Sequence, residues 1–451
     1  MDSSTPFKSS AEVYEWIEGF INLERDLDSR PMKLENMKKL AALAGNPENC
    51  AQAVHIAGSK GKGSVSAMTA SILKAAGYKT ASYASPHVRD FRERITLGNN
   101  FFDEGLYALA GNELRRTAGL CIDGGNHTPS FFELFTLWFF LCSRFSDSEV
   151  MALETGLGGR LDATNIVDPL VSVITVIEKE HTKILGDTIE KIAAEKAGII
   201  KTGKPLVLAE QKAEALEVFR QKAKETQSPF YYFPDIAGIS GLRIDRNGSS
   251  FDLNLRHPLF ETEIKNLNIP VPGEVQVKNA GLAALAVKTV FPGISEEAIR
   301  KGLGCFSLPA RFEKLNDDPV LIIDGAHTAL SVGECIRTFT ELYGTGGICI
   351  FGCAADKDAD TIASLAVPCF SKIIVTTPGS FKRSYPAEAY EIFCRFASQN
   401  KPGAEILLVT DTKEACKLAL ETGKAHGLPI LGTGSFYLAA EITKEKQQII
   451  L

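Results

Sequence analysis

The stretch from Ala53 to Gly77 reads AVHIAGSKGKGSVSAMTASILKAAG and decides how the chain is expected to fold. Its apolar run 54–57 predicts a short strand, its three glycines predict a loop, and the residues from Ser64 to Ala76 have helical periodicity. Glycine permits close backbone approach to a ligand, and a helix N-terminus presents unpaired N–H groups to an anion. The pattern therefore predicts a loop that holds nucleotide phosphates, with Lys62 on the β- and γ-phosphates and Ser64 near Mg²⁺.

The spacing of this loop departs from the usual GxxxxGK[ST] pattern. His55 stands where that pattern has its first glycine, and Gly63 separates Lys62 from Ser64. An ordinary turn between a strand and a helix would account for the glycines alone. We favour the phosphate loop because glycine, lysine and serine coincide at one strand-to-helix junction.

Length and composition describe a globular protein with room for two domains. The chain has 451 residues, of which 45% are hydrophobic and 23% charged. This length exceeds what one hydrophobic core usually holds. Its net charge of −6 gives no electrostatic reason to expect nucleic acid or an anionic membrane surface as a partner. The ten cysteines show no metal-ligand spacing and are expected to be reduced, buried thiols. Without a recognisable signal or membrane segment, we expect a cytoplasmic protein.

Polar residues follow several predicted strands, at the sheet edge where ligands of open α/β sheets bind. Ser85 and His87 follow the strand 79–85, and Glu154 ends the strand 150–153. A carboxylate beside a phosphate loop suits Mg²⁺, which prefers hard oxygen ligands. His181 follows the strand 171–177, although a lone histidine is often structural. The charged run 89–94 is typical of a solvated loop.

The aromatic segment Phe131 to Phe145 predicts a buried helix, whose first turn could face a flat ring. Asn247-Gly248 between alternating segments predicts a hairpin. The pattern restarts near 305–310, where we place a linker. Beyond it, strands at 320–323, 348–352, 372–377, 405–410 and 429–432 alternate with helical segments, which predicts a small, doubly wound α/β domain. Its first strand ends in Asp324-Gly-Ala-His-Thr328.

These motifs, in this order, resemble the folylpolyglutamate synthases and dihydrofolate synthases of the Mur ligase superfamily. The resemblance implies an α/β fold with a P-loop-containing central domain of the Mur ligase type, residues 1–306. A smaller Rossmann-like doubly wound domain, residues 307–451, would close over ATP and bind glutamate. The segments that carry it are GSKGKGS (58–64), SPH…FRERI (85–95), SFFE (130–133), ETGLGGRLDATN (154–165), H…LGDTIEKIAAEKAGI (181–199), the helix with Asn279, ARFE (310–313), DGAH (324–327) and GTGSFYL (432–438).

The resemblance also implies roles for residues at matching positions. Lys62, Glu154, His181 and Lys196 match catalytic positions, and the family commonly carries Lys196 as a carbamate. Positions matching ATP contacts are Gly58, Gly61, Lys62, Gly63, Ser64, Asn279, Arg311, Asp324 and His327. Those matching magnesium ligands are Ser64, Ser85, Glu154 and His181. Those matching the substrate pocket are Ser85, His87, Phe131, Phe132, Glu133, Leu161, Asp162 and Ala163.

The implied activity is ATP-driven amide formation with Mg²⁺, in which an acyl phosphate of the substrate reacts with L-glutamate. The acceptor would be dihydropteroate, a reduced folate or both, and the enzyme a monomer. Three positions depart from the family pattern: Lys60 in the glycine loop, Glu180 before His181, and Thr328 after DGAH. Two alternatives stay open. One is a Mur-type ligase acting on a UDP-sugar peptide; such ligases normally carry a separate uridine-binding domain, for which the first 50 residues look too short. The other is a non-catalytic ATP-binding relative.

Overall fold

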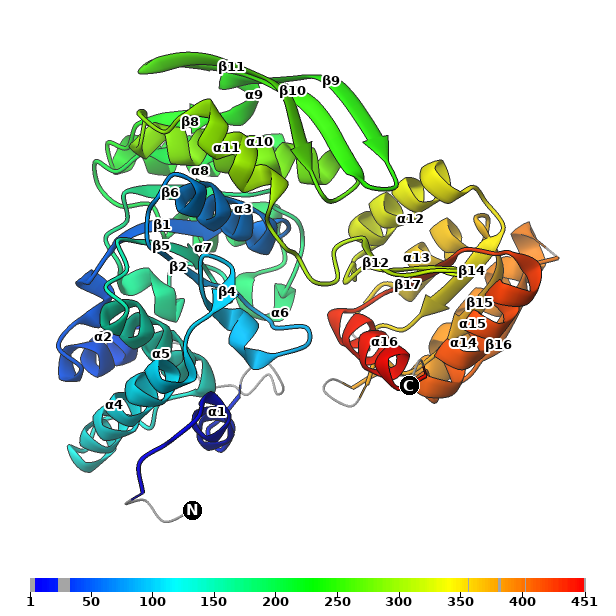
Figure 1. Cartoon of the computed structure of the whole chain (residues 1–451), viewed down its shortest axis with the longest axis horizontal. Coiled ribbons are helices and arrows are strands. Elements are labelled where there is room, and N and C mark those ends of the chain that lie inside the picture. Colours follow the sequence, from blue (N-terminus) through cyan, green and yellow to red (C-terminus); the bar gives the residue numbers. More distant parts are fainter. Residues whose placement is uncertain (1–4, 23–32, 356, 380–382, 402, 450–451) are drawn as a thin grey trace. The chain divides into compact units, whose positions relative to one another are not determined.

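The computed structural model describes residues 5–22, 33–355, 357–379, 383–401 and 403–449 (Figure 1). The chain divides into two compact units, each described here by itself. Unit 1 comprises Met1–Arg243, Ser249–Pro270 and Glu274–Ser307. Unit 2 comprises Leu308–Leu451 together with the short segments 244–248 and 271–273. No helix in these described ranges is both long and apolar enough to cross a membrane.

The sheet of unit 1 is built around β1 (Gln52–Ala57), the strand that leads into the glycine loop. In the described part of the chain it has eight strands in the order β4-β3-β2-β5-β1-β6-β7-β8. β1 pairs in parallel with β5 and β6, so that His55 lies between Leu153 and Ser172. The other strands are β2 (Thr80–Tyr83), β3 (Ile95–Leu97), β4 (Asn100–Phe101), β5 (Val150–Glu154), β6 (Val171–Ile174), β7 (Leu206–Leu208) and β8 (Phe230–Tyr232).

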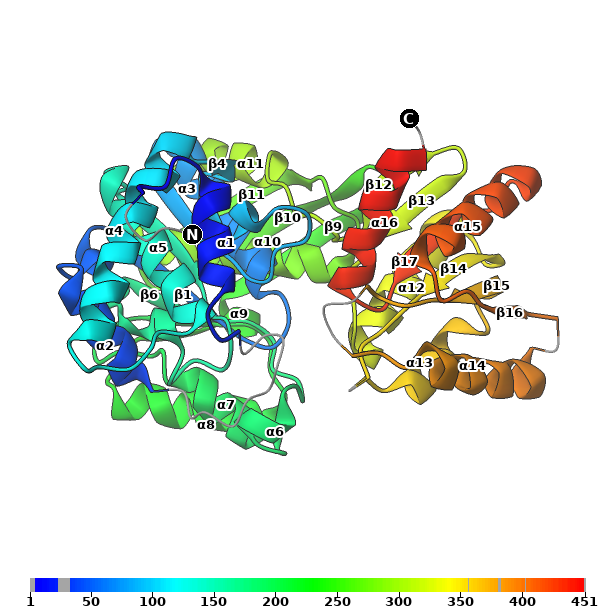
Figure 2. The same cartoon turned by 90° about the horizontal axis from the view of Figure 1, so that it is seen from below.

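Helices cover both faces of this sheet, because alternate side chains of β1 point to opposite sides. On one face, Ala53 belongs to an apolar core with α1, α2, α4 and α5. Ala57 points to the same face and belongs to a second core with α7 and α8. α3 packs with α10 and α11 on the other face (Figure 1). Figure 2 shows α1 beside α4 and α5. The bounds are α1 (Ser10–Glu18), α2 (Leu34–Leu43), α3 (Lys62–Ala75), α4 (Glu104–Asp123), α5 (Phe131–Phe145), α6 (Thr182–Leu185), α7 (Ile189–Ala197), α8 (Ala213–Glu225), α9 (Phe233–Ile236), α10 (Glu274–Val290) and α11 (Glu296–Gly304).

A smaller three-stranded sheet, in the order β11-β10-β9, accompanies the main one. β9 (Ala237–Asp245) and β10 (Gly248–His257) are neighbours joined at Asn247, which confirms the predicted hairpin. β11 (Phe260–Ile269), which pairs antiparallel with β10, was not predicted. The described residues of unit 1 also form three short 3₁₀ helices: η1 (Pro47–Asn49), η2 (Phe91–Arg94) and η3 (Ala163–Ile166).

Unit 2 contains a sheet in the order β12-β13-β17-β14-β15-β16. Its strands β13 to β17 run parallel, and helices α12 to α14 and α15 to α16 form two layers around them (Figure 2), which confirms the doubly wound domain. The antiparallel edge strand β12 was not predicted. The bounds are β12 (Glu313–Asp317), β13 (Val320–Ile323), α12 (Ala329–Tyr343), β14 (Gly347–Phe351), α13 (Ala359–Ala366), β15 (Phe370–Val375), α14 (Pro386–Asn400), β16 (Glu405–Leu408), α15 (Thr412–His426), β17 (Ile430–Thr433) and α16 (Phe436–Ile449).

Candidate active site

The glycine loop between β1 and α3 is held against the end of β6 by its backbone. The amides of Ser59 and Lys60 donate to the carbonyl of Val176 at 2.9 and 3.2 Å. Gly58 has φ +147°, and a Cβ there would lie 1.8 Å from Oγ1 of Thr175. No side chain fits at that position, so Gly58 is needed for the loop to lie this close to the neighbouring strand.

Lys62 and Ser64 occupy the first turn of α3, where an anion would meet the helix dipole. The ammonium of Lys62 donates to the carbonyl of Gly58 at 2.9 Å, so the side chain folds back over its own loop. Ser64 is buried. The residue before the helix, Gly61, has left-handed backbone geometry and provides no side-chain cap. The helix starts at Lys62, two residues earlier than the predicted start at Ser64.

Asn279 lies directly against this loop, although it comes from α10, more than 200 residues further along the chain. It is buried, and a Cβ placed on Gly61 would lie 2.7 Å from its Oδ1. The structure thus brings together a loop and a helix that the sequence connected only through the family resemblance.

Glu154 lies at the end of β5 with its carboxylate turned to the glycine loop. It is buried, and its Oε2 accepts the amide N–H of Ser85 at 3.2 Å. A Cβ on Gly63 would lie 3.4 Å from the same oxygen. The carboxylate and the hydroxyls of Ser64 and Ser85 are hard oxygen donors, so this donor set fits Mg²⁺.

His181 differs from the other predicted metal ligands. It is exposed at the start of the short helix α6, with φ 47° in the left-handed region. The described residues contain no group of three or more His, Cys, Asp and Glu side chains arranged to hold a metal ion. The structure therefore does not gather His181 with Glu154 into such a group.

Lys196, which is buried, and Glu180, which is partly buried, form a charge cluster against the glycine loop. The ammonium of Lys196 donates to the carbonyl of Gly58 at 2.6 Å and to Glu180 Oε1 at 2.9 Å. Lys60 Nζ lies 4.0 Å from Glu180 Oε2. Burial lowers the pKa of Lys196 to about 8, against the opposing effect of Glu180. Burial alone would raise the pKa of Glu180, but the positive charges of Lys196, Lys62 and Lys60 hold it well below its usual range.

Two of the three departures from the family pattern thus interact with each other. Lys60 and Glu180 are both part of this cluster. Sequence reasoning treated them as separate substitutions. Their proximity in the structure shows that the positive charge of Lys60 lies beside the acidic side chain of Glu180.

The predicted substrate segments meet at the loop that follows Glu154. A Cβ on Gly156 would lie 2.2 Å from Cζ of Phe132, so this ring packs on the loop backbone. Asp162 is buried and accepts the amides of Gly156 and Leu157 at 2.9 and 2.8 Å. Leu161 is half-buried beside it, and Ala163 begins η3.

Two other predicted substrate residues have structural contacts. Phe131 is buried and packs with Phe135, their ring centroids 5.2 Å apart. Glu133 completes the capping box of α5 with Ser130, and its Oε1 lies 3.5 Å from Nε2 of His127. Their contacts here are with the core and the helix terminus.

His87 is paired with Arg94, whose Nε donates to His87 Nδ1 at 2.9 Å. The expectation that residues 89–94 form a solvated loop is wrong for Arg94, which is 1% exposed and lies over the rings of Phe131 and Phe135. Glu93 folds the segment by accepting the amide of Val88 at 2.7 Å. Arg94 therefore packs against an aromatic core and donates a hydrogen bond to a histidine. The spacing of charges in the sequence could not show these contacts.

In unit 2, Arg311 is presented by two residues in the left-handed region, Ala310 (φ 52°) and Phe312 (φ 45°). Asp324 fixes this segment, because its Oδ2 accepts the amide of Phe312 at 2.8 Å and its Oδ1 that of Ala326 at 2.7 Å. Such strained backbone commonly marks functional segments. Burial raises the pKa of Asp324, although Arg311 and the two amides oppose this shift.

The guanidinium of Arg311 lies 4.1 Å from the ring centroid of Phe436, at the start of α16. His327 is 5.7 Å from the same ring, and its Nδ1 lies 2.9 Å from the carbonyl of Gly325. The three predicted ATP-contacting residues of this unit are thus neighbours. Phe436, which joins them, was not among the predicted site residues, although it stands in the GTGSFYL segment.

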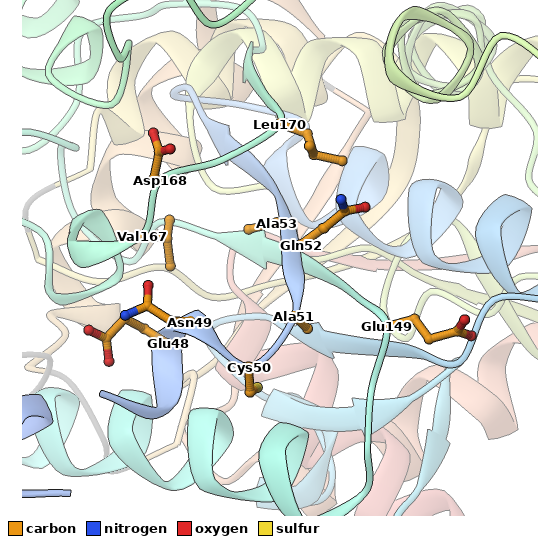
Figure 3. Close-up of a pocket in the computed structure, with 10 residues that line it drawn as sticks. All are labelled: Glu48, Asn49, Cys50, Ala51, Gln52, Ala53, Glu149, Val167, Asp168 and Leu170. Atoms are coloured by element: carbon orange, nitrogen blue, oxygen red, sulfur yellow. The ribbon is translucent and has the colours of Figure 1, made fainter. Parts of the chain in front are cut away.

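A pocket of about 400 Å³ lies at the amino ends of β1, β5 and β6, opposite the edge that carries the glycine loop (Figure 3). Figure 3 shows the carboxylates of Glu48, Glu149 and Asp168 around it, pointing in different directions. None of the predicted site residues is among the described residues that line it. We therefore do not assign it to the active site.

A mostly parallel sheet whose central strand runs into a glycine loop with Lys62, beside a carboxylate on the next strand, defines a phosphate-loop nucleotide-binding protein. Comparison with known proteins narrows this class. Two family models match: the Mur ligase middle domain over residues 56–287, and the Mur ligase glutamate ligase domain over residues 310–436.

The relatives cover the chain almost completely. The dihydrofolate synthase/folylpolyglutamate synthase of Bacillus subtilis is 33% identical over 418 residues, 91% of this chain and 94% of that protein. The crystal structure of folylpolyglutamate synthase from Thermotoga maritima has a TM-score of 0.81 at 29% identity and covers 96% of both chains. A complex of FPGS with AMPPCP and folate has a TM-score of 0.79 at 27% identity, over 98% of this chain and 100% of that one.

The chain belongs to the Mur ligase family and, within it, to the folylpolyglutamate and dihydrofolate synthases. It is an enzyme, a ligase, as the resemblance of its motifs predicted. These relatives give no support to the alternative of a ligase for UDP-sugar peptides.

Proposed function

We propose that the reaction of this enzyme, the ATP-dependent addition of L-glutamate to a folate, proceeds through an acyl phosphate formed beside Lys62. The observation that carries this proposal is the glycine loop, whose lysine, helix N-terminus and neighbouring Glu154 and Asn279 converge on one place. Phosphoryl transfer needs mainly positioning and charge stabilisation, which such a site provides.

The proposed chemistry has two steps. A carboxylate oxygen of the folate attacks the γ-phosphorus of ATP, the bond to the β-phosphate oxygen breaks, and ADP leaves. The amine of L-glutamate then attacks the acyl carbon, inorganic phosphate leaves with the electrons of the C–O bond, and the amine loses a proton. The ammonium of Lys62 and the N-terminal amides of α3 stabilise the charge on the transferred phosphoryl group.

We propose that Glu154, Ser64 and Ser85, together with His181, hold Mg²⁺. A bound Mg²⁺ neutralises charge on the phosphate oxygens and orients them. The oxygen donors of the first three residues fit this role, whereas His181 is exposed in the structure. In unit 2, Arg311, Asp324 and His327 are proposed to contact ATP.

The carbamate on Lys196 that the resemblance implies stays a prediction. Its reaction with CO₂ needs the neutral amine, and a pKa of about 8 leaves a fraction of that form near neutral pH. Glu180 opposes the modification, because it lies 2.9 Å from the amine and would repel a second negative charge. The monomeric state and the cytoplasmic location also stay predictions.

The proposed folate pocket is formed around the loop 155–163 and the start of α5. Phe132 packing on Gly156 and Asp162 holding the loop amides support it. We include Ser85, His87, Phe131, Glu133, Leu161 and Ala163 in this pocket.

The test is ADP release by the purified enzyme with Mg-ATP and L-glutamate. One reaction receives tetrahydrofolate and another dihydropteroate. Stimulation by tetrahydrofolate alone indicates polyglutamylation, stimulation by dihydropteroate alone indicates dihydrofolate synthesis, and stimulation by both indicates a bifunctional enzyme. Silence in both reactions would overturn the proposed function and favour a non-catalytic relative.

A pair of lysine variants controls this assay. Replacing Lys62 with Ala removes the charge at the loop and is expected to lower turnover about 100-fold or more. Lys79→Ala removes an exposed lysine at the amino end of β2, on the opposite edge of the sheet, and should leave turnover unchanged. Equal turnover of the two variants would contradict the role of Lys62.

A further inference from the structure

A buried chain of hydrogen bonds runs from the central strand to the loop after Glu154. His55, on β1, is completely buried, and its Nε2 lies 2.8 Å from Oγ1 of Thr164. That hydroxyl lies 2.5 Å from Oδ1 of Asp162. The other oxygen of Asp162 accepts the amides of Gly156 and Leu157. Three side chains thus connect β1 to the loop backbone without exposure to solvent.

The direction of donation in this chain follows from chemistry. The carboxylate of Asp162 accepts four hydrogen bonds, from Thr164 Oγ1, the Thr164 amide and the two loop amides. The Thr164 hydroxyl therefore donates to Asp162 and must accept from the Nε2–H of His55. The Nδ1 of His55 has no hydrogen-bond partner among the described residues. The imidazole is thus neutral, with its proton on Nε2, and within the described part of the chain it hydrogen-bonds to Thr164 alone.

The position of His55 in the sheet connects this series of hydrogen bonds to the strand that leads into the glycine loop. His55 is three residues before Gly58, and its side chain lies on the sheet face between the core around Ala53 and the core around Ala57. The loop that Asp162 holds begins directly after Glu154 and carries Gly156, on which Phe132 packs. The central strand β1 is therefore connected to the loop that follows Glu154 through buried side chains.

We propose that His55 and Thr164 are positioning residues that fix the loop 155–162 through Asp162, and so set the affinity for the folate. The part of this proposal that concerns folate affinity rests on the proposed function. We expect the order of the loop 155–162 and the folate affinity to depend on the hydrogen bonds from His55 through Thr164 to Asp162. ATP binding at the glycine loop should not depend on them.

Amide hydrogen exchange tests the structural part without any substrate. Loss of one buried hydrogen bond, about 1 kcal/mol, should raise the exchange rate of the segment 155–162 about fivefold in His55→Leu and in Thr164→Val. His55→Gln, whose amide can place an N–H near the position of Nε2, and Thr164→Ser, which keeps the hydroxyl, should restore most of the protection. Unchanged exchange in both His55→Leu and Thr164→Val would overturn the proposal.

Steady-state kinetics test the functional part. In His55→Leu the KM for the folate should rise about fivefold, with the KM for ATP within about twofold of its original value. Val54→Ala is the matched control, because Val54 is equally buried on the same strand but points to the opposite face. It should lower the melting temperature and leave the folate KM unchanged. An equal folate KM increase in Val54→Ala would show that general destabilisation, and not positioning, is responsible.

The two proposals can fail separately. If the unmodified enzyme releases no ADP with any folate, the proposed function is wrong, and hydrogen exchange still decides whether the chain fixes the loop. If the unmodified enzyme is active and His55→Leu raises the KM for ATP as much as that for the folate, the selective positioning role is wrong.

Discussion

At the scale of single residues, the glycine loop depends on two positions that have no side chain. Gly58 and Gly61 both have positive φ, and each lies against a side chain of another element. At Gly58 the obstacle is Thr175, directly after β6, whose amide donates to the carbonyl of Ala57 at 2.8 Å. At Gly61 it is the carboxamide of Asn279, which can rotate away. A substitution at Gly61 should therefore change binding more than folding.

Gly61→Ala is expected to cost about 1–2 kcal/mol for the left-handed backbone and to displace Asn279 from the loop. The KM for ATP should rise about tenfold, because both the loop and Asn279 are in the proposed nucleotide site. Gly119→Ala is the control. That glycine lies within α4 with open space around it, and alanine there should stabilise the helix by about 0.5–1 kcal/mol. An unchanged KM for ATP in Gly61→Ala would contradict the nucleotide role of this loop.

At the scale of elements, the strands and helices that carry the proposed site could be predicted from sequence because their periodicity is local. α5 has the predicted bounds, and β5 is longer than predicted only by Glu154. Side chains that act across the sequence could not be predicted. Arg94 is received by an aromatic core, and Lys196 finds Glu180 sixteen residues away.

The link between the Arg311 segment and α16 is another contact of this kind. Phe436 packs so closely on Gly325 that a Cβ there would lie 2.1 Å from the ring, and Arg311 stacks on the same ring. Replacing Phe436 with Leu keeps an apolar side chain but removes the π face. With a cation–π contribution of about 1 kcal/mol, the KM for ATP should rise about fivefold.

The control for this variant is Phe339→Leu, a buried aromatic of α12 in the same unit. It should lower the melting temperature without changing the KM for ATP. If Phe436→Leu behaves like Phe339→Leu in the ATP titration, the ring does not position Arg311 for nucleotide binding.

At the scale of the whole molecule, the buried histidine of β1 makes stability depend on pH. Burial, with a smaller effect of Lys201, lowers the pKa of His55 from 6.5 to about 3. The unfolded chain therefore binds a proton at this residue at higher pH than the folded chain does. The stabilisation is fully present above about pH 6.5 and is lost as the pH falls from there toward 3.

Comparison of the unmodified protein with His55→Gln isolates this effect. Between pH 7.5 and pH 5.0 the unmodified protein should lose about 2 kcal/mol more of its unfolding free energy than the variant, which has no proton to gain at this position. The measurement is denaturant unfolding followed by tryptophan fluorescence, because both tryptophans of the chain, Trp16 and Trp138, lie in unit 1 with His55. Carboxylates titrate equally in both proteins and cancel. Equal losses of stability would mean that His55 can take up a proton in the folded state, and the hydrogen-bond chain to Asp162 would then have to be reversed or broken.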